Sequence, residues 1–327
     1  MRPLFLLFLG AALCYANTDS NQPKIESLMD NVLVLMVPYI RGRVYVNLTC
    51  GEAYQNQPVF WKENGVELKP ALQGNHVKVL VVELRGGNYS CHQSPDGRYL
   101  NHTTILVQPE RDNRSIILQE KSPKGGHIHC SAPNYKGSFH CTWTRSTNRP
   151  MAAVLLVTAE RDLKNIPCVL DANGSGVHCN DTICRISEEQ HSISLTVYIR
   201  SYSLLEKHTK TFFLRDIVRP ANLPNLHTSD MKVFSWGYPE TWDKPCAFFP
   251  LQFQVKVVPS GHDCSSMEPL VNTATEQTQY EVRVKVKKFV FCVKAQDKIT
   301  NGPFNQWSSC KVNKHEVKCS SDTGLQP

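Results

Sequence analysis

Short stretches of alternating hydrophobic and polar residues recur along most of the chain, and a period of two predicts β-strands. Such stretches are expected at residues 44–50, 58–62, 77–84, 87–91, 192–201, 251–257, 280–286 and 289–295. Turn-forming Gly, Pro and Asn residues separate them, and no helix longer than a turn or two is expected. The pattern predicts an all-β protein of three tandem β-sandwiches.

The first sandwich is expected at residues 17–110 and carries the markers of an immunoglobulin-like domain. Cys50 and Cys91 end two predicted strands, Trp61 lies between them, and Tyr89 stands two residues before the second cysteine. This spacing is typical of an inter-sheet disulfide covered by a core tryptophan, with a tyrosine at the corner. We therefore predict a Cys50–Cys91 disulfide.

The second sandwich is expected at residues 111–219 and contains two short cysteine pairs. Ten residues separate Cys130 from Cys141, and ten separate Cys168 from Cys179. Each pair closes a loop that fits two neighbouring antiparallel strands, and Trp143 follows the second cysteine by two positions. This arrangement is typical of the cysteine-bearing fibronectin type III domain of cytokine receptors.

The third sandwich is expected at residues 220–313, followed by a tail at 314–327. Pro220 and Pro224 cannot lie in a central strand, so they mark the linker and the edge at which this domain starts. A Gly302-Pro303 turn precedes Phe304 and the sequence Gln306-Trp307-Ser308. Several short strands with turns between them predict a second fibronectin type III sandwich.

The first residues predict secretion. An apolar run from Leu4 to Leu13 follows Met1-Arg2, and small residues near Ala16 favour cleavage of a signal peptide at 1–16. The run is too short to span a bilayer, and we expect neither membrane insertion nor a membrane anchor. Acceptor triplets for glycosylation stand at Asn47, Asn88, Asn101, Asn113, Asn173 and Asn180.

Charge and motifs exclude several function classes. The formal charge of +7 is modest for a secreted chain of 327 residues, so a solvated basic surface is favoured over nucleic-acid binding. The chain lacks the Gly-x-Ser-x-Gly, His-Glu-x-x-His and phosphate-loop patterns of common enzymes. We therefore predict a binding protein without catalytic residues, cofactor or metal.

Together these features resemble one family. An immunoglobulin domain, a four-cysteine receptor domain and a Trp-Ser-like motif, all secreted, are similar to the soluble cytokine-receptor-like proteins of the interleukin-12 beta-subunit family. The most specific stretches are 130–143, 212–220, 238–242 and 294–297. The resemblance implies a disulfide-linked heterodimeric cytokine, in which the chain clasps a four-helix-bundle alpha subunit and presents it to a cell-surface cytokine receptor. The first domain is the implied receptor-docking face.

The resemblance also implies a binding pocket at the elbow between the second and third domains. It assigns partner contacts to Tyr135, Phe248 and Asp297, with Asp297 receiving an arginine from the helical partner. The alternatives are that both aromatic residues belong to the core and that Asp297 only forms a turn.

Cysteine parity adds a candidate covalent contact. Twelve cysteines remain after signal removal, and Cys184 lies in a polar stretch beyond Cys179. A leftover cysteine in a secreted chain indicates an intermolecular bond, which the resemblance places on the alpha subunit. An internal partner for Cys184 is the alternative. Cys310 is expected to pair within its domain, but the sequence leaves open the connectivity among Cys246, Cys264, Cys292, Cys310 and Cys319.

The Trp-Ser motif is degenerate here. Such motifs stack basic side chains over aromatic faces, and we expect a ladder of Phe304, Trp307 and Ser308 with Arg283, Lys285 and Lys294. A solvated strand face and a heparin site are the alternative interpretations of the basic residues. A soluble alpha-type cytokine receptor, and an antagonist homodimer through Cys184, are the alternative functions.

Overall fold

The computed structural model describes residues 23–37, 42–69, 72–83, 85–109, 116–120, 125–149, 151–182, 189–242, 250–314 and 316–320. These residues form strands and only short helical turns, which confirms the all-β prediction. They group into two compact units, one of residues 1–114 with 202–205 and one of residues 115–201 with 206–327. The predicted signal peptide lies outside the described residues. Within the described part, no helix is long and apolar enough to cross a membrane.

The first unit is an immunoglobulin-type sandwich. Strands β3 and β6 pair in one sheet, and strands β5, β4, β7 and β8 follow one another in the other, where β2 runs parallel to β8. Cys50 follows β3 and forms a disulfide with Cys91 in β7. The strands are β1 Lys24–Met29, β2 Val32–Val37, β3 Arg43–Thr49, β4 Val59–Glu63, β5 Val66–Glu67, β6 His76–Val82, β7 Gly87–Gln93 and β8 Tyr99–Pro109.

Two aromatic residues occupy the centre of this sandwich. Trp61 is 1% exposed and donates a hydrogen bond from Nε1 to the Gly74 carbonyl at 3.0 Å. Tyr89 is also buried, and its hydroxyl donates to Glu63 Oε1 at 3.1 Å. A tyrosine corner usually bonds to the backbone. Here the partner is a carboxylate, and burial together with Glu63 raises the pKa of Tyr89.

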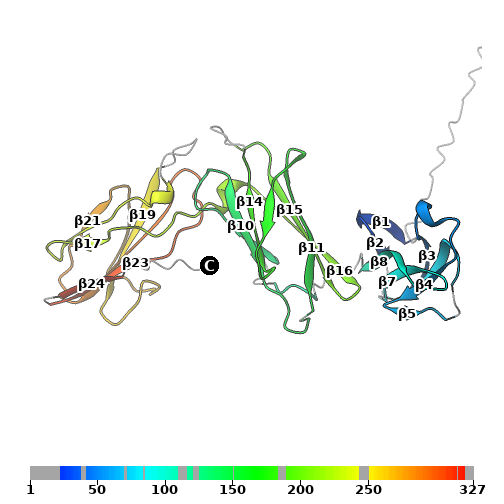
Figure 1. The fold of residues 1–327 in the computed structure, drawn as a ribbon. Helices are drawn as coiled ribbons and strands as arrows, with labels where there is room; N and C mark the ends of the chain where they lie inside the picture. Colours follow the sequence, from blue (N-terminus) through cyan, green and yellow to red (C-terminus); the bar gives the residue numbers. More distant parts are fainter. Residues whose placement is uncertain are drawn as a thin grey trace, which may run out of the picture. The chain divides into compact units, whose positions relative to one another are not determined.

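The second unit begins with a sandwich of two layers of strands. One has the order β13-β14-β10-β9 and the other the order β12-β11-β15-β16. Figure 1 shows these strands gathered into one body, coloured green. Their bounds are β9 Ile128–Ser131, β10 Ser138–Trp143, β11 Ala153–Arg161, β12 Lys164–Asn165, β13 Cys168–Leu170, β14 Gly176–Asn180, β15 Ile193–Ser201 and β16 Leu204–Phe212.

Both predicted short cysteine pairs form disulfides in the first of these sheets. Cys130 lies directly opposite Cys141 in the β9–β10 pairing, and Cys168 lies opposite Cys179 in the β13–β14 pairing. Each bond therefore links neighbouring strands of one sheet. Trp143 is buried in the same sandwich.

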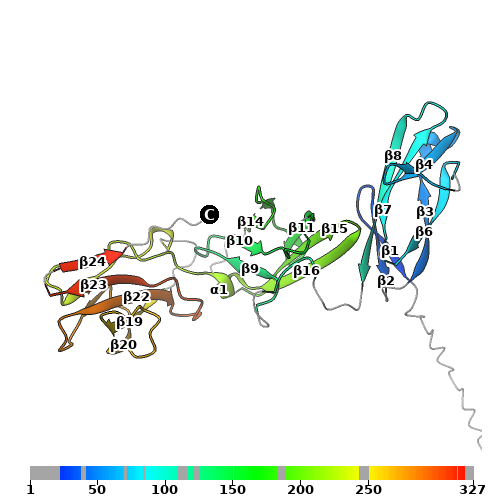
Figure 2. The same cartoon turned by 90° about the horizontal axis from the view of Figure 1, so that it is seen from below.

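The second unit ends with another sandwich, which follows the short helix α1 (Leu214–Ile217). Its sheets have the orders β17-β18-β21 and β20-β19-β22-β23-β24. Figure 2 shows the five strands of the larger sheet side by side in that order. The bounds are β17 His227–Thr228, β18 Val233–Ser235, β19 Leu251–Pro259, β20 Val271–Thr275, β21 Gln279–Glu281, β22 Phe289–Asp297, β23 Ser308–Asn313 and β24 Glu316–Ser320.

Two sequence-based expectations differ from the structure here. The strand expected at 280–286 ends at Glu281, because its partner β18 offers only three residues for pairing. Part of the predicted tail forms strand β24, which pairs with β23 and places Cys319 opposite Cys310. These two cysteines form a disulfide, and Cys264 pairs with Cys292.

Candidate functional site

The structure brings Tyr135 and Asp297 together, although 162 positions separate them in the chain. Tyr135 lies in the loop between β9 and β10, and Asp297 is the last residue of β22. The Tyr135 hydroxyl donates a hydrogen bond to Asp297 Oδ2 at 2.8 Å and lies 3.3 Å from Thr300 Oγ1. Two predicted partner-binding residues from different sandwiches therefore contact each other directly.

Asp297 is already well supplied with hydrogen bonds. It is 1% exposed, and its Oδ1 atom accepts from the backbone N–H groups of Ile299 and Thr300 at 2.7 and 2.8 Å. These bonds fix the turn after β22, which corresponds to the turn-forming alternative for this residue. A cation from a partner would therefore have to join or displace the Tyr135 hydroxyl to reach Oδ2.

An aromatic wall and a second hydrogen bond support the contact. The Tyr135 ring meets the ring of Trp242 edge-on, with centroids 5.9 Å apart, and Trp242 is buried. Asn134 donates from Nδ2 to the Thr241 carbonyl at 2.8 Å, while its Oδ1 accepts from the Lys136 N–H. Trp242 was not predicted as a site residue, although it lies in the family-like stretch 238–242. Phe248 lies outside the described residues.

Burial raises the pKa of the Tyr135 hydroxyl, and the charge of Asp297 raises it further, while the hydrogen bond with Thr300 acts in the opposite direction. The pKa of an isolated tyrosine is about 10. A raised pKa means that the folded state resists losing this proton, so the stabilisation is present below about pH 10 and is lost as pH rises above it.

We therefore expect Tyr135 and Tyr89 to ionise only above the ordinary pH range of a tyrosine in an alkaline titration. Near-ultraviolet absorbance of tyrosinate would measure this. The Tyr135→Phe and Tyr89→Phe variants should each remove one late-titrating group. Loss of an early group in the Tyr135→Phe variant would contradict the burial argument.

A buried arginine anchors both ends of the segment that contains Cys184. Arg161, at the end of β11, is 3% exposed. Its Nε lies 2.9 Å from Asp181 Oδ2, and its Nη2 lies 2.9 Å from Glu189 Oε1. Residues 183–188, including Cys184, lie outside the described residues, but their two flanks are held on one guanidinium group.

Glu189 also ties this anchor to helix α1, which precedes the third sandwich. Its carboxylate accepts hydrogen bonds from the backbone N–H groups of Leu214 and Arg215, at 2.8 and 3.0 Å. The charge of Glu189 also contributes to raising the pKa of Tyr135, so the anchor and the Tyr135–Asp297 contact act on each other electrostatically. Sequence reasoning missed Arg161, Asp181 and Glu189, because a charged residue at a strand end ordinarily faces solvent.

The disulfides of the described residues limit which cysteines could bond to Cys184. The ten described cysteines pair among themselves, in the five bonds given above. Cys184 and Cys246 lie outside the described residues. The ten paired cysteines are therefore not available to bond to Cys184.

The degenerate Trp-Ser motif forms a short cation–π stack. Lys294 Nζ lies 4.0 Å from the Phe304 ring centroid and 4.5 Å from that of Trp307. Lys256 Nζ lies 5.6 Å from the Trp307 ring centroid and donates to the carbonyls of Cys264 and Ser266. Burial, with the charge of Lys256, lowers the pKa of Lys294. Ser308 is buried beside this stack at the start of β23.

Two other predicted ladder residues lie elsewhere. Arg283 follows the end of β21, is exposed, and pairs with Glu281 at 2.7 Å. Lys285 is exposed as well. The expectation that these two stack over aromatic rings fails because β21 is too short to carry them beside Trp307. Lys256, which was not predicted from the sequence, lies near the Trp307 ring in their place.

The acceptor asparagines differ in accessibility. Asn101 is half-buried, and its Nδ2, the atom that carries a glycan, donates to the Cys50 carbonyl at 3.0 Å. Asn113 lies outside the described residues. The exposed acceptors are Asn47, Asn88, Asn173 and Asn180.

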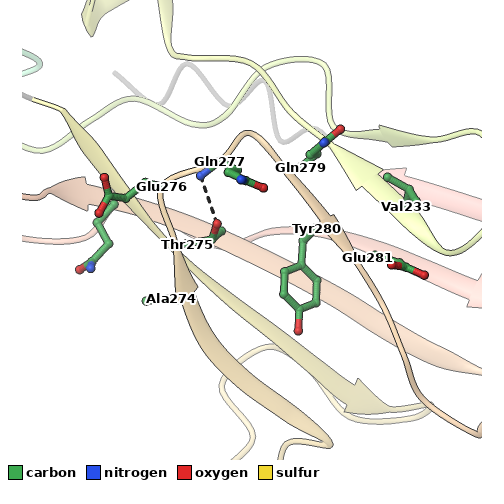
Figure 3. A pocket seen from close by; sticks show the side chains of 9 residues that line it. Val233, Ala274, Thr275, Glu276, Gln277, Gln279, Tyr280 and Glu281 are labelled. Atoms are coloured by element: carbon green, nitrogen blue, oxygen red, sulfur yellow. Dashed lines mark hydrogen bonds between the residues drawn. The ribbon is translucent and has the colours of Figure 1, made fainter.

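An open hollow of about 770 Å³ lies in the last sandwich, between β20 and β21. Figure 3 shows its lining, where the Gln277 N–H donates to the Thr275 hydroxyl. Glu276 at its rim pairs with Lys298. None of the predicted site residues lines this hollow, so it adds nothing to the predicted binding site.

Comparison with known proteins gives one consistent answer. Residues 125–201 match the family described as the cytokine interleukin-12p40 C-terminus. The chain is 27% identical to the interleukin-12 subunit beta of Homo sapiens, over 71% of this chain and 77% of that protein. It is 25% identical to the same subunit of Felis catus, over 87% and 92% of the two chains. For Sigmodon hispidus the identity is 25% over 82% and 86%.

These relatives carry the name of a cytokine subunit and not that of an enzyme. The comparisons therefore confirm the resemblance to interleukin-12 beta subunits.

Proposed function

We propose that this chain, which is similar to interleukin-12 beta subunits along most of its length, is a secreted cytokine subunit that binds a four-helix-bundle alpha subunit. The complex would then be presented to a cell-surface cytokine receptor in immune signalling. The observation that carries the proposal is the Tyr135–Asp297 contact, which joins the second and third sandwiches.

The proposed binding surface combines a charged and a covalent contact. An arginine of the helical partner would approach Asp297 Oδ2, with Tyr135, Trp242 and Phe248 around it, and would gain a charge-assisted hydrogen bond. Cys184 would form the intermolecular disulfide. The Arg161 anchor supports this role because it limits how far the Cys184 segment can move from the contact.

The test is co-expression of the chain with candidate four-helix-bundle subunits, followed by non-reducing and reducing gels. We expect Cys184→Ser to abolish the covalent heterodimer. We expect Asp297→Ala to weaken the affinity for the alpha subunit in the non-covalent complex at least tenfold, a loss of about 1.4 kcal/mol or more.

Asp230→Ala is the matched control for Asp297→Ala. Asp230 also accepts two backbone N–H groups in a turn, from Lys232 and Val233, but it is exposed and stands apart from Tyr135. An Asp297→Ala variant that assembles as tightly as Asp230→Ala would refute the assignment. A covalent homodimer through Cys184, with no heterodimer, would favour the antagonist alternative. A monomer that binds a helical ligand reversibly would favour the soluble receptor.

The exposed basic run after β21 supports a second candidate. Arg283, Lys285, Lys287 and Lys288 all face solvent, which is what contact with heparin would require. Retention on a heparin column that falls in the Lys287→Ala/Lys288→Ala variant would support it, and unchanged retention would refute it.

A further inference from the structure

Two histidines and an aspartate meet on the outer face of the sheet that holds the two short disulfides. His140 in β10 lies directly opposite His178 in β14, and their rings stack with centroids 3.9 Å apart and planes 7° apart. Asp171 follows β13 and lies in the turn that leads into β14. The alternate residues of β10 and β14, among them Cys141 and Cys179, point into the core. The three side chains therefore form an outward-facing cluster on rigid strands.

The ligand atoms of this cluster converge. His140 Nε2 lies 3.0 Å from Asp171 Oδ2, and His178 Nε2 lies 3.5 Å from Asp171 Oδ1. One ligand atom from each of the three residues lies within 4.8 Å of the other two. Zinc bonds to imidazole nitrogen and carboxylate oxygen at about 2.0–2.2 Å, so neighbouring ligands on one tetrahedral ion lie about 3.4 Å apart. Small side-chain rotations would bring all three ligands onto one ion.

Gly176 provides the space for this convergence. A Cβ built at this position would overlap Asp171 Oδ2 and would lie 2.8 Å from His140 Nε2. The same Cβ would also lie 3.0 Å from the backbone carbonyl oxygen of Cys141. Glycine at this position therefore leaves room both for the two ligand side chains and for the neighbouring backbone of β10.

The cluster has the composition of an open metal site. Two neutral imidazoles and one carboxylate are a common zinc ligand set, and a fourth position is left for water or for a donor from another chain. The exposed fractions of the side chains, 26% for His140, 20% for Asp171 and 69% for His178, leave one side open to solvent. The simple alternative is a His–Asp hydrogen bond with a stacked second histidine, which would not bind metal.

We propose that His140, Asp171 and His178 bind a divalent transition-metal ion, zinc in the extracellular setting, on the outer face of the second sandwich. The inference is independent of partner binding, since none of the three residues belongs to the Tyr135–Asp297 contact or to the Cys184 segment. Its failure would leave the proposed cytokine function untouched.

The test is titration of the metal-free, tag-free full chain with Zn²⁺, after alkylation of any reduced thiol, with isothermal calorimetry as the readout. We expect one zinc ion per chain. His178→Ala and Asp171→Asn should each weaken the affinity at least tenfold. Binding should also weaken on acidification, because imidazole must be neutral to act as a ligand. Replacement of zinc by Co²⁺ should give the visible absorption of a tetrahedral site.

His191→Ala is the matched control. His191 lies 3.9 Å from Asp162 in the same sandwich and is similarly exposed, but that pair has no third ligand within the described residues. We expect its zinc affinity to equal that of the unaltered chain. Circular dichroism would verify that each variant folds. His178 is the most exposed of the three ligands, so its loss should leave the fold intact. Absence of stoichiometric binding, or binding that His178→Ala leaves unchanged, would overturn the proposal.

Discussion

Replacing Arg161 by methionine is expected to lower the free energy of unfolding of the second unit by about 3–5 kcal/mol. The guanidinium group is 3% exposed and lies 2.9 Å from both the Asp181 and the Glu189 carboxylates. Methionine fills similar volume, but it leaves two carboxylates in a buried setting without their counter-charge. The cost arises from that uncompensated charge more than from any lost attraction.

Urea unfolding of the purified chain would measure the loss, and hydrogen exchange would locate it. Arg283→Met is the matched control, because the same substitution there removes an arginine–carboxylate pair in which Arg283 is 82% exposed. Exposed pairs contribute about 0–1 kcal/mol, so that variant should unfold almost as the unaltered chain does. A change of less than 1 kcal/mol on Arg161→Met would show that solvent reaches the pair. We also expect faster exchange at the flanks of 183–188, and with it a lower yield of any bond formed by Cys184.

Removing the Cys50–Cys91 disulfide by double alanine substitution is expected to destabilise the first unit by about 4 kcal/mol. The bond closes a loop with a sequence separation of 41, and a loop of that length restricts the unfolded chain considerably. Both sulfur atoms are fully buried in the core cluster with Trp61, so two small cavities add to the loss. A single sandwich is held by a net free energy of only about 5–15 kcal/mol, so a loss of this size removes a large share of its stability.

The two units can be followed separately in one experiment by hydrogen exchange with mass spectrometry. Peptides from residues 43–109 should exchange faster in the double variant, while those from the second unit should not change. The matched control is Cys310→Ala/Cys319→Ala, which opens a loop with a sequence separation of only 9 at the far end of the chain. That variant should affect β23 and β24 and leave the first unit as it was. Equal protection of β3 and β7 with and without Cys50–Cys91 would contradict the prediction.

The sequence was informative wherever a local pattern decides the structure. Seven of the eight strands that alternation predicted lie within two residues of their expected bounds at each end, because one buried face allows only one register. The ten-residue spacings of Cys130–Cys141 and Cys168–Cys179 fit hairpin-like neighbours, and the structure contains both bonds. The family-like stretches led to Tyr135 and Asp297, which do lie within one hydrogen bond of each other.

What the sequence could not supply depends on contacts between distant segments. Nothing local to Arg161 indicates burial, since only the fold brings Asp181 and Glu189 to it. The strand expected at 280–286 has the right alternation, but a strand extends only as far as its neighbour, and β18 stops at three residues. The ladder was assigned to Arg283 and Lys285 on that extended strand, whereas Lys256 comes from β19 and stands beside Trp307. In each case the missing information is which distant segment of the chain lies next to the residue or strand.

The pairing of β24 with β23 has a practical consequence for anyone who shortens the chain. A version ending at Val312 would leave the Cys310 thiol without its Cys319 partner and would expose the outer backbone groups of β23, a strand edge that can recruit another chain. The native edge strand instead presents the charged pair Glu316 and Lys318 to solvent. Strand β24 thus protects the last sandwich from self-association. A fragment that is to stay monomeric should therefore include residues up to Ser320 and should not end with β23.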